Sequence, residues 1–467
     1  MTTQRRQLWL AGGPGAVRRQ AAWSPPDAGA VAGDGRWLQV LYSCLLYLTM
    51  PLWLLHLLLS ARRHGGYVRR VHERFGLVDS RLRGHGCIWI HAVSVGEVQA
   101  ALPLVQSLRR SYPGRPILLT TTTPTGSDTV RRLLGEQVTH TYLPWDLPGA
   151  VERFLARVQP AAAIILETEL WPNLFSACGR RPIPLLLVSA RLSAGSARRY
   201  GRLRPLIRRT LRQCTRILAR SPEDAQRFAA LGAPVERLQV GGNLKFDYRV
   251  PDDQVQAAQA LSREAQGRKV WVAACTHAGE ESVVLEVHKR LRMQYPQLLL
   301  VLVPRHPERF QRIAAMCIAR GLAVSRRSTG THVVPETAVL LGDTMGELPL
   351  YYAMSDAAFI GGSMVPVGGH NPVEAAAQGV AMVIGPRTFK ITDTLRLFQE
   401  ADAITQVPDA GALADALARL FRDPEMARQQ GARARRLVIS GRGATAAAVA
   451  EVCEQLPPPA QARSADA

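Results

Sequence analysis

The chain has 467 residues, with 58 Lys and Arg against 37 Asp and Glu and a formal net charge of +21 at pH 7. This length allows two or three domains, and 47% hydrophobic with 20% charged residues excludes wholesale disorder. The seven cysteines are scattered without a C-x-x-C pair, which argues against a disulfide scaffold or a zinc ribbon. The charge indicates an anionic partner, but it does not separate nucleic acid, membrane and phosphorylated substrate.

The N-terminal part predicts a membrane anchor. Residues 1–36 are rich in Gly, Ala, Pro and Arg, and we expect a disordered extension. Residues 38–59 (LQVLYSCLLYLTMPLWLLHLLL) are uncharged, and about 20 apolar residues are enough to cross the hydrocarbon core as a helix. We therefore expect a transmembrane helix over 37–61; a buried core helix and a monotopic segment are the alternatives. Five arginines (62, 63, 69, 70 and 74) follow it, and the positive-inside rule then places everything after residue 60 in the cytoplasm.

From residue 84 onwards, short β-branched or Leu runs alternate with helical segments, which is typical of βαβ units with a parallel sheet. The pattern pauses over 247–269 and then restarts. We therefore predict an α/β protein with two Rossmann-like domains, 62–248 and 249–455, that face a cleft, followed by a disordered tail over 456–467. The expected strands are 87–93, 116–123, 161–167 and 183–190 in the first domain, and 269–276, 297–304, 338–342, 357–362 and 381–385 in the second.

Two motifs in the first half follow predicted strands, where ligands bind in such sheets, and a third lies on a loop near the domain boundary. In HAVSVGE (91–97), Glu97 opens a helix and is either a functional acid or a charge that complements the helix dipole. In ETELWPN (167–173), Glu167 and Glu169 lie on one side of a strand end, which favours a raised pKa for one of them if they are buried. Lys245 of GGNLKFD (241–247) is either functional or solvated.

The second half offers residues suited to an anion. Arg305 of PRHPER (304–309) follows an apolar strand and could hold a phosphate through two hydrogen bonds. The segment 361–379 combines a Gly-rich loop with a helix N-terminus, where backbone N–H groups bind anions, and Glu374 could accept from ribose hydroxyls. Neither unit has G-x-G-x-x-G after its first strand, and no Walker A motif occurs, which disfavours dinucleotide oxidoreduction and P-loop hydrolysis.

In this order, the motifs resemble those of the Kdo transferases (3-deoxy-D-manno-octulosonic acid transferases) of Gram-negative lipopolysaccharide synthesis, from about residue 38 to residue 450. The matching segments are ERFG (73–76), HAVSVGE, ETELWPN, SARLS (189–193), LKFD, THAGEE (276–281), PRHPER, DTMGEL (343–348) and GGHNPVEAA (368–376).

The resemblance implies a GT-B glycosyltransferase that moves Kdo with inversion from CMP-Kdo to the lipid A precursor (lipid IVA) and releases CMP, without metal or other cofactor. It implies an acceptor domain before the hinge and a donor domain after it. It makes Glu97 the general base, with Glu167 and Lys245 as stabilisers of the transition state. The residues that it places at CMP are Pro304, Arg305, Met345, Gly346, Glu347, Asn371, Pro372, Val373 and Glu374.

The chain departs from the family pattern in one loop, where the usual Phe-Asn-Phe after Gly-Pro is replaced in GPRTFKITD (385–393) by a segment with Lys390 and Ile391. Residues 1–36 have no counterpart in the family pattern.

The distribution of charge favours a membrane over nucleic acid. Residues 1–250 hold 35 Lys and Arg against 15 Asp and Glu, whereas the remainder is nearly neutral. Residues 170–222 carry Arg at twelve positions and no acid, with few of the interleaved aromatics that single-stranded nucleic acid requires. We expect the basic half to bind anionic lipids of the inner membrane, with the catalytic body on the cytoplasmic side and no nucleic-acid partner. The competing interpretations are another GT-B nucleotide-sugar enzyme, such as an epimerase, and a nucleic-acid-binding membrane protein.

Overall fold

The computed structural model describes residues 35–63, 70–79, 86–248, 252–265, 267–330 and 332–457, apart from the side chains of 55–63 and 252–255. The extension expected over 1–36 therefore lies outside the described residues except for its last two, and the tail expected over 456–467 lies outside them except for its first two.

The first sheet has seven parallel strands in the order β3–β2–β1–β4–β5–β6–β7. Its inner strands are buried on both faces and consist of apolar runs, as parallel sheets covered by helices require. The strands are β1 (Ile88–His91), β2 (Ile117–Thr121), β3 (Thr139–Tyr142), β4 (Ala162–Leu166), β5 (Leu185–Ala190), β6 (Arg216–Ala219) and β7 (Leu238–Val240).

The second sheet repeats this plan in the order β10–β11–β9–β8–β12–β13–β14, again all parallel. The two sheets confirm the predicted α/β class with two Rossmann-like units. The strands are β8 (Val270–Thr276), β9 (Leu299–Pro304), β10 (Val324–Arg326), β11 (Val339–Leu341), β12 (Ala357–Ile360), β13 (Ala381–Ile384) and β14 (Thr405–Gln406).

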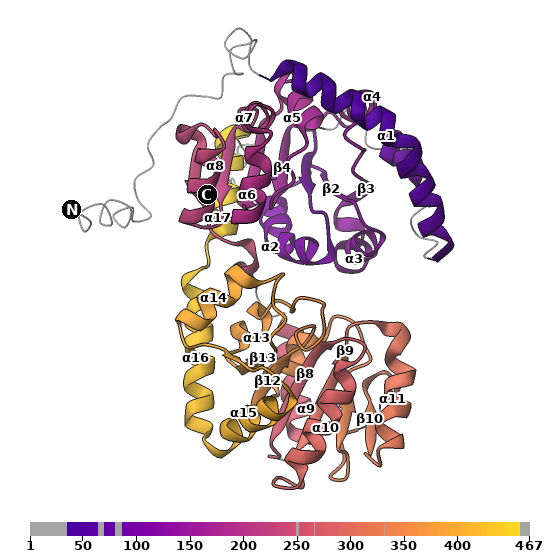
Figure 1. The fold of residues 1–467 in the computed structure, drawn as a ribbon, viewed down its shortest axis with the longest axis vertical. Coiled ribbons are helices and arrows are strands. Elements are labelled where there is room, and N and C mark those ends of the chain that lie inside the picture. The colour runs from indigo at the N-terminus through magenta and orange to yellow at the C-terminus, as the bar shows by residue number, and fades with distance from the viewer. Residues whose placement is uncertain are drawn as a thin grey trace, which may run out of the picture. The chain divides into compact units, whose positions relative to one another are not determined.

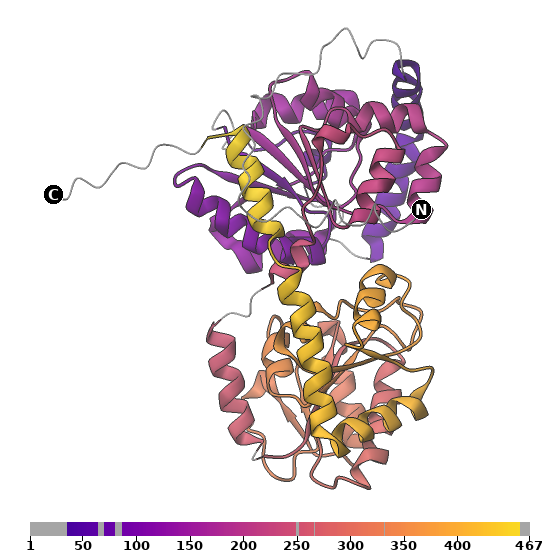
Figure 2. The same cartoon turned by 90° about the vertical axis from the view of Figure 1, so that its left-hand side faces the viewer.

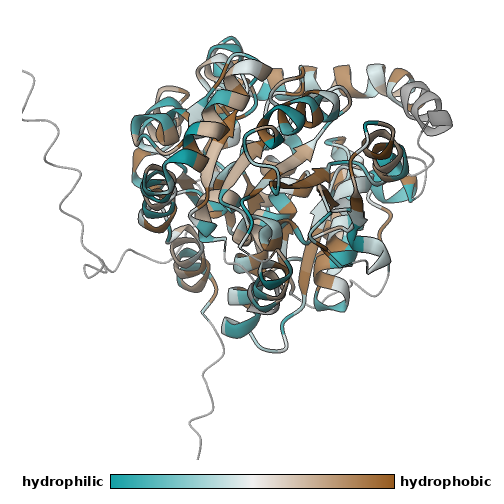
Figure 3. Ribbon diagram, turned by 90° about the horizontal axis from the view of Figure 1, so that it is seen from below, coloured by the Kyte–Doolittle hydropathy of each residue, from teal (hydrophilic) through white to brown (hydrophobic). Residues whose placement is uncertain are grey.

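All nine expected strands form, and the structure adds β3, β6, β7, β10 and β14. These additional strands are short, and several carry polar residues, so the sequence pattern did not reveal them. Figure 3 shows hydrophobic residues along the strands and hydrophilic residues on the covering helices.

Helices cover both sheets (Figure 1). In the first half they are α1 (Arg36–Arg63), α2 (Val95–Ser111), α3 (Pro124–Leu134), α4 (Pro148–Val158), α5 (Pro172–Gly179), α6 (Ala194–Gly201), α7 (Arg204–Leu211) and α8 (Pro222–Ala230), with 3-10 turns η3 (Val71–Phe75), η5 (Gly135–Gln137), η6 (Val235–Arg237) and η7 (Leu244–Asp247). In the second half they are α9 (Asp252–Glu264), α10 (Glu280–Arg292), α11 (Phe310–Ala319), α12 (Leu348–Ala353), α13 (Val373–Gln378), α14 (Thr392–Glu400), α15 (Ala410–Arg422), α16 (Pro424–Ser440) and α17 (Ala444–Gln455), with 3-10 turns η8 (Pro307–Arg309) and η9 (Arg327–Thr329).

The chain divides into two compact units, the second of which is Gly242–Thr445, while the first takes the residues on either side. This division differs from the domain boundaries expected from the sequence, because Lys245 falls in the second unit and most of α17 in the first. The return of α17 is held by Glu451, whose carboxylate accepts hydrogen bonds from Arg216 at 2.9 Å and Gln239 at 3.0 Å. Figure 2 shows α17 lying along the strands of the first unit.

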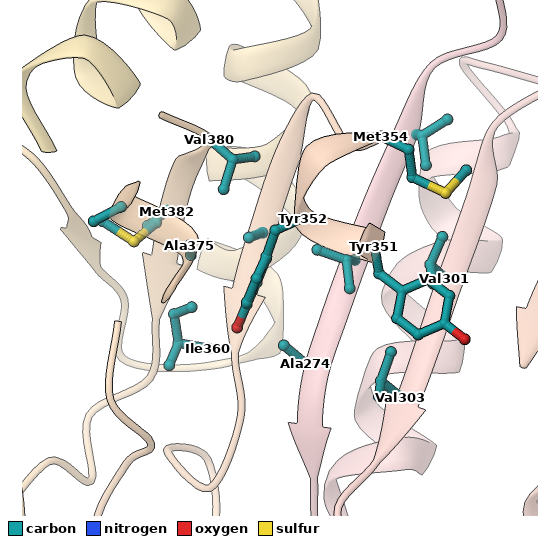
Figure 4. Packing of buried hydrophobic residues seen from close by; sticks show 14 of the residues in the cluster. Ala274, Val301, Val303, Tyr351, Tyr352, Met354, Ile360, Ala375, Val380 and Met382 are labelled. Atoms are coloured by element: carbon teal, nitrogen blue, oxygen red, sulfur yellow. The ribbon is translucent and has the colours of Figure 1, made fainter. Parts of the chain in front are cut away.

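The core of the second unit lies directly beneath the strand ends that carry the predicted donor residues. Tyr351 and Tyr352 of α12 are almost fully buried against Ala274, Val303 and Ile360 of the central strands (Figure 4). Burial of this much aromatic surface stabilises the sheet and fixes the loops that leave its carboxyl edge.

Helix α1 belongs to the first unit and packs on α5 and α7. Its residues Arg36–Leu54 are long and apolar enough to cross a membrane by length and composition.

Candidate functional site

Glu97 lies in the first turn of α2, directly after β1, and is held by the turn that precedes it. Its Oε2 accepts the backbone N–H of Val93 at 2.8 Å, and its Oε1 accepts the Ser94 hydroxyl at 3.2 Å. Ser94 is the N-cap of this helix, and Glu97 lies in its first turn, where its charge also complements the helix dipole. A carboxylate has about four acceptor sites, so these bonds orient the group and are compatible with a role toward a substrate.

Glu167 follows β4 in a left-handed backbone conformation, with φ of 55°. Its N–H donates to the Val188 carbonyl at 3.1 Å, which ties it to the neighbouring strand β5. A non-glycine residue in this region costs about 1–3 kcal/mol, and such strain gathers at functional sites. Ser189 in β5 and Cys275 in β8 have the same conformation at strand irregularities near the carboxyl edges of the two sheets.

Glu169 has the raised pKa expected for one member of this acidic pair. Burial raises its pKa to about 7, and the nearby charge of Glu167 adds to the effect, while the neighbouring Trp171 opposes it.

The three residues predicted to act in catalysis do not lie in one unit. Because β1 and β4 are hydrogen-bonded neighbours, Glu97 and Glu167 follow adjacent strands and share the carboxyl edge of the first sheet. Lys245 lies in η7 of the second unit, where its N–H donates to Asn243 Oδ1 at 3.1 Å.

Most residues predicted at CMP come from the carboxyl edge of the second sheet. Pro304 ends β9, and the Arg305 N–H donates to the carbonyl of Thr276 at the end of β8, at 3.0 Å. The segment 371–374 enters α13 from the loop after β12, which pairs with the other side of β8. The order β9–β8–β12 therefore brings Arg305 and Glu374 together, and the Arg305 charge acts on the Glu374 carboxyl.

Glu280, a residue that the sequence did not single out, holds the Gly-rich loop in place. Its fully buried carboxylate accepts the N–H groups of Gly362 at 2.7 Å, Ser363 and Met364 at 2.9 Å, and His277 at 2.9 Å. Such a carboxylate is satisfied by backbone donors and makes the loop rigid. The only sequence signal was its position in THAGEE, a matching motif without an assigned role.

Gly361 shows why this loop requires glycine. A Cβ atom at this position would lie 2.5 Å from the carbonyl oxygen of Ala274, so any side chain would push the loop away from β8.

A cluster of histidines and cations occupies the same edge. The His277 and His370 rings stack with centroids 5.0 Å apart, and the His306 ring meets His277 edge-on at 5.1 Å. Burial, then neighbouring rings and the charges of Arg305 and Lys390, lower the pKa to about 4 for His277 and about 3 for His370. Both rings are therefore neutral at pH 7, while the neighbouring Arg305 and Lys390 supply positive charge for an anion.

Lys390 comes from the loop in which the chain departs from the family pattern. Its backbone N–H donates to the Gly368 carbonyl at 3.1 Å, and its charge acts on both stacked histidines. The departure thus adds a cation beside the Gly-rich loop.

Glu374 has a raised pKa. Burial raises it to about 7, against the opposing charge of Arg305. Asn371, earlier in the segment, uses its Oδ1 to accept the Val373 N–H at 3.4 Å, which starts the helix after Pro372.

Glu347 lies before α12 and is bound by Arg327, which sequence reasoning also missed. The guanidinium donates through Nε at 3.1 Å and through a terminal nitrogen at 2.9 Å. Although burial acts the other way, the hydrogen bonds of Arg327 and Thr344 hold the pKa of Glu347 below its usual value. Met345 is exposed, and Gly346 has φ of 92°, so the turn before Glu347 presents its backbone to solvent.

Within the part of the chain that the structure describes, no group of three or more His, Cys, Asp or Glu side chains is arranged to hold a metal ion. Metal independence stays a prediction.

Family models match both halves of the chain. Residues 69–248 match the model described as 3-deoxy-D-manno-octulosonic-acid transferase (kdotransferase), and residues 270–437 match glycosyl transferases group 1. The 3-deoxy-D-manno-octulosonic acid transferase of Haemophilus influenzae is 40% identical over 410 residues, covering 86% of this chain and 95% of that protein. The protein of the same name from Bordetella pertussis is 40% identical over 416 residues, covering 86% and 96%.

Solved structures share the architecture. The UDP-GlcNAc 2-epimerase of Neisseria meningitidis bound to UDP-GlcNAc aligns with a TM-score of 0.55 at 14% identity, covering 79% of this chain and all of that one. Staphylococcus aureus MnaA with UDP aligns with a TM-score of 0.53 at 15% identity, covering 78% and 95%. At such identities the likeness shows the fold alone, which agrees with the predicted GT-B class. The C-terminal CMP-Kdo binding domain of WaaA from Acinetobacter baumannii is 34% identical and covers 40% of this chain and 99% of that one, with a TM-score of 0.39.

Proposed function

Since the chain belongs to the 3-deoxy-D-manno-octulosonic acid transferase family of glycosyltransferases, we propose that it transfers Kdo from CMP-Kdo to the lipid A precursor (lipid IVA) and releases CMP. The observation that carries the donor assignment is the cationic edge of the second sheet. There Arg305, Lys390 and the histidine pair surround a Gly-rich loop that Glu280 holds rigid.

The second unit binds the donor. Arg305 and Lys390 neutralise the CMP phosphate and the sugar carboxylate, because charge-assisted hydrogen bonds are the strong ones for such groups. Pro304 and the segments 345–347 and 371–374 shape the site around the nucleotide, with Glu374 accepting from ribose hydroxyls.

The first unit binds the acceptor and supplies the base. Glu97 takes the proton of the acceptor hydroxyl as its oxygen attacks the anomeric carbon of Kdo with inversion. The bond from that carbon to the phosphate oxygen breaks, and its electron pair leaves with CMP. Glu167 and Lys245 stabilise the charge that develops in the transition state.

Transfer requires neither metal nor cofactor, because the cations of the second unit can neutralise the leaving phosphate. The acceptor is a phosphorylated glycolipid, and we place the enzyme at the inner membrane. Its body lies on the cytoplasmic side, α1 is its anchor, and the basic first unit contacts anionic lipids. The positive charge of the first unit binds anionic lipids, and nucleic acid is not a partner.

The test is to incubate the full-length protein with CMP-Kdo and lipid IVA and to measure product masses and released CMP. We expect lipid IVA that carries Kdo and an equal amount of CMP. UDP-GlcNAc should remain unchanged in the same assay. Epimerised UDP-GlcNAc without any Kdo-bearing lipid would overturn the proposal in favour of another GT-B enzyme.

A further inference from the structure

Helix α1 exposes an apolar stripe on one face. Trp37, Leu41, Leu45, Leu48 and Leu52 follow one another every three or four residues, which places them on one side of a helix. Each is between 55% and 76% exposed. An exposed apolar surface of this length marks a contact with lipid or another apolar partner.

The opposite face of α1 is docked on the first unit through polar groups. Asn173 of α5 accepts hydrogen bonds through its Oδ1 from Gln39 at 3.1 Å and from Ser43 at 3.0 Å. Arg209 of α7 donates to Gln39 Oε1 at 2.9 Å. Figure 1 shows α1 running along α5 and past α4.

A buried carboxylate extends this contact. Asp146 accepts the N–H groups of Asn173 at 3.0 Å and Leu174 at 2.7 Å, and Tyr42 of α1 lies close enough to act on its carboxyl. One helical turn later, the Tyr47 hydroxyl accepts the Gly149 N–H at 3.4 Å. The docked part of α1 therefore reaches from its first turn to Tyr47.

The docked length leaves too little helix to cross a bilayer. From residue 48 to the charged pair at 62 and 63, the helix rises about 21 Å, against about 30 Å of hydrocarbon. A crossing by 36–54 would carry the docked polar surface of the body, with Arg209, into the hydrocarbon, which is strongly unfavourable for charged groups.

The surface beside the docked end suits anionic headgroups. Arg198, Arg199, Arg202 and Arg204 are exposed on α6, on α7 and in the link between them. A Cβ added to Gly35 would lie 2.9 Å from the carbonyl oxygen of Pro205, so the start of α1 adjoins this basic segment. With lipid on its exposed apolar stripe, the body on its opposite face and arginines beside its docked end, α1 can lie in the membrane surface.

We propose that α1 lies in the plane of the membrane, with its apolar stripe in the lipid and its polar face docked on the enzyme, and does not cross the bilayer. This in-plane helix replaces the single transmembrane crossing that the sequence predicted. This inference rests on the membrane location proposed above. Both ends of α1 then lie on the same side of the membrane as the catalytic body.

The test determines on which side of the membrane each of two introduced cysteines lies. The full-length protein also carries Cys44→Ser, which removes the exposed cysteine of α1. Arg36→Cys reports the start of α1, and Arg132→Cys, an exposed position on α3, reports the body. Spheroplasts are treated with a membrane-impermeant maleimide before and after lysis in detergent. We expect both positions to react only after lysis.

The outcomes separate the two proposals. Reaction of Arg36→Cys alone in intact spheroplasts means a crossing and overturns the in-plane helix. Reaction of both in intact spheroplasts overturns the cytoplasmic location but supports the in-plane helix, because both ends still share a side.

A matched pair of variants tests the docking contacts. Gln39→Leu removes the bonds to Asn173 and Arg209, so we expect part of the Arg36→Cys population to become reactive from outside. Thr49→Leu adds similar hydrophobicity but removes only bonds to the Leu45 and Leu46 carbonyls within α1, and it should leave the labelling unchanged. If the two variants are labelled from outside to the same extent, whether that extent is higher than in the parent protein or unchanged, docking is not the cause of the in-plane position.

Discussion

The Nε2 atom of His277 lies 2.8 Å from the Nε2 atom of His370. Two unprotonated ring nitrogens repel at this distance, so the Nε2–H of one ring donates a hydrogen bond to the Nε2 of the other. The accepting ring must then carry its own proton on Nδ1, which makes it an N–H donor while both rings remain neutral. Next to Arg305 and Lys390, such a donor is suited to bind the anionic part of CMP-Kdo.

Replacing His277 with Ala should weaken donor binding. Loss of one hydrogen bond is equivalent to about 0.5–1.5 kcal/mol, so we expect the KM for CMP-Kdo to rise about 3- to 10-fold with little change in kcat. The matched control is His332→Ala, an exposed histidine of the same unit, which should behave as the wild type. A fall in kcat at constant KM would contradict the binding role.

Replacing Glu97 with Gln should abolish transfer without unfolding the protein. Gln preserves the size of the side chain and one acceptor oxygen for the turn at Val93 but cannot take a proton. A lost general base lowers kcat by about 10²- to 10⁴-fold. We expect CMP binding, measured by calorimetry, to be unchanged. Glu136→Gln, at an exposed position in η5, is the control, and near-normal turnover of Glu97→Gln would refute the base assignment.

Replacing Arg305 with Ala should raise the donor KM more than the histidine variant does. A hydrogen bond to a charged group contributes about 1.5–3 kcal/mol, so the expected increase is about 10- to 100-fold. Arg305→Lys should recover part of it, since the charge remains while the planar fork is lost. Arg312→Ala, at an exposed position on α11, is the control. An unchanged KM in Arg305→Ala would remove this residue from the donor site.

Acid should destabilise the second unit through His288. Its Nδ1 accepts from the Trp271 indole at 3.2 Å, and its Nε2 lies 3.0 Å from the Ala338 carbonyl, so the buried ring is neutral. Burial lowers its pKa to about 3. In the unfolded chain this histidine has a pKa near 6.5. Between about pH 6.5 and pH 3 it is therefore protonated in the unfolded chain but not in the folded chain. The free energy of unfolding then falls as the pH drops, by up to about 1.4 kcal/mol per pH unit for this group.

The variant His288→Gln isolates that contribution. Gln can accept from Trp271 and donate to Ala338 but does not titrate. All other groups titrate alike in both proteins, so denaturant unfolding at pH 7 and pH 5 should show a smaller loss of stability in the variant. Equal losses would contradict the assignment.

A metal chelator should leave transfer unaffected. If the cations of the second unit are sufficient for the leaving phosphate, extensive dialysis against EDTA should not lower the rate of Kdo transfer. A loss of activity that Mg²⁺ or another divalent cation restores would show that a metal takes part.

The sequence predicted the central strands because their apolar runs are buried on both faces, as in 162–166 and 299–304. It predicted the places of Glu97, Glu167 and Arg305 because residues after parallel strands must lie at one edge. It did not reveal Arg327 or Glu280, since their partners Glu347 and Gly362 are far away in the chain and the pairing depends on how the loops fold. It placed Lys245 at the end of the first domain, whereas in the structure this residue belongs to the second unit.

The charge of +21 and the uncharged stretch over 38–59 are properties of the sequence by itself, and they indicated an anionic partner and determined that the chain carries an apolar helix. Composition and the length of an apolar stretch do not depend on contacts between distant residues, so they can be read from the sequence without knowledge of the fold. The side that α1 turns toward the body was decided only by the tertiary structure. The start of α5 brings Asn173 next to Asp146. Gln39, Tyr42 and Ser43 form a docked face only because these two partners lie opposite them in the folded protein.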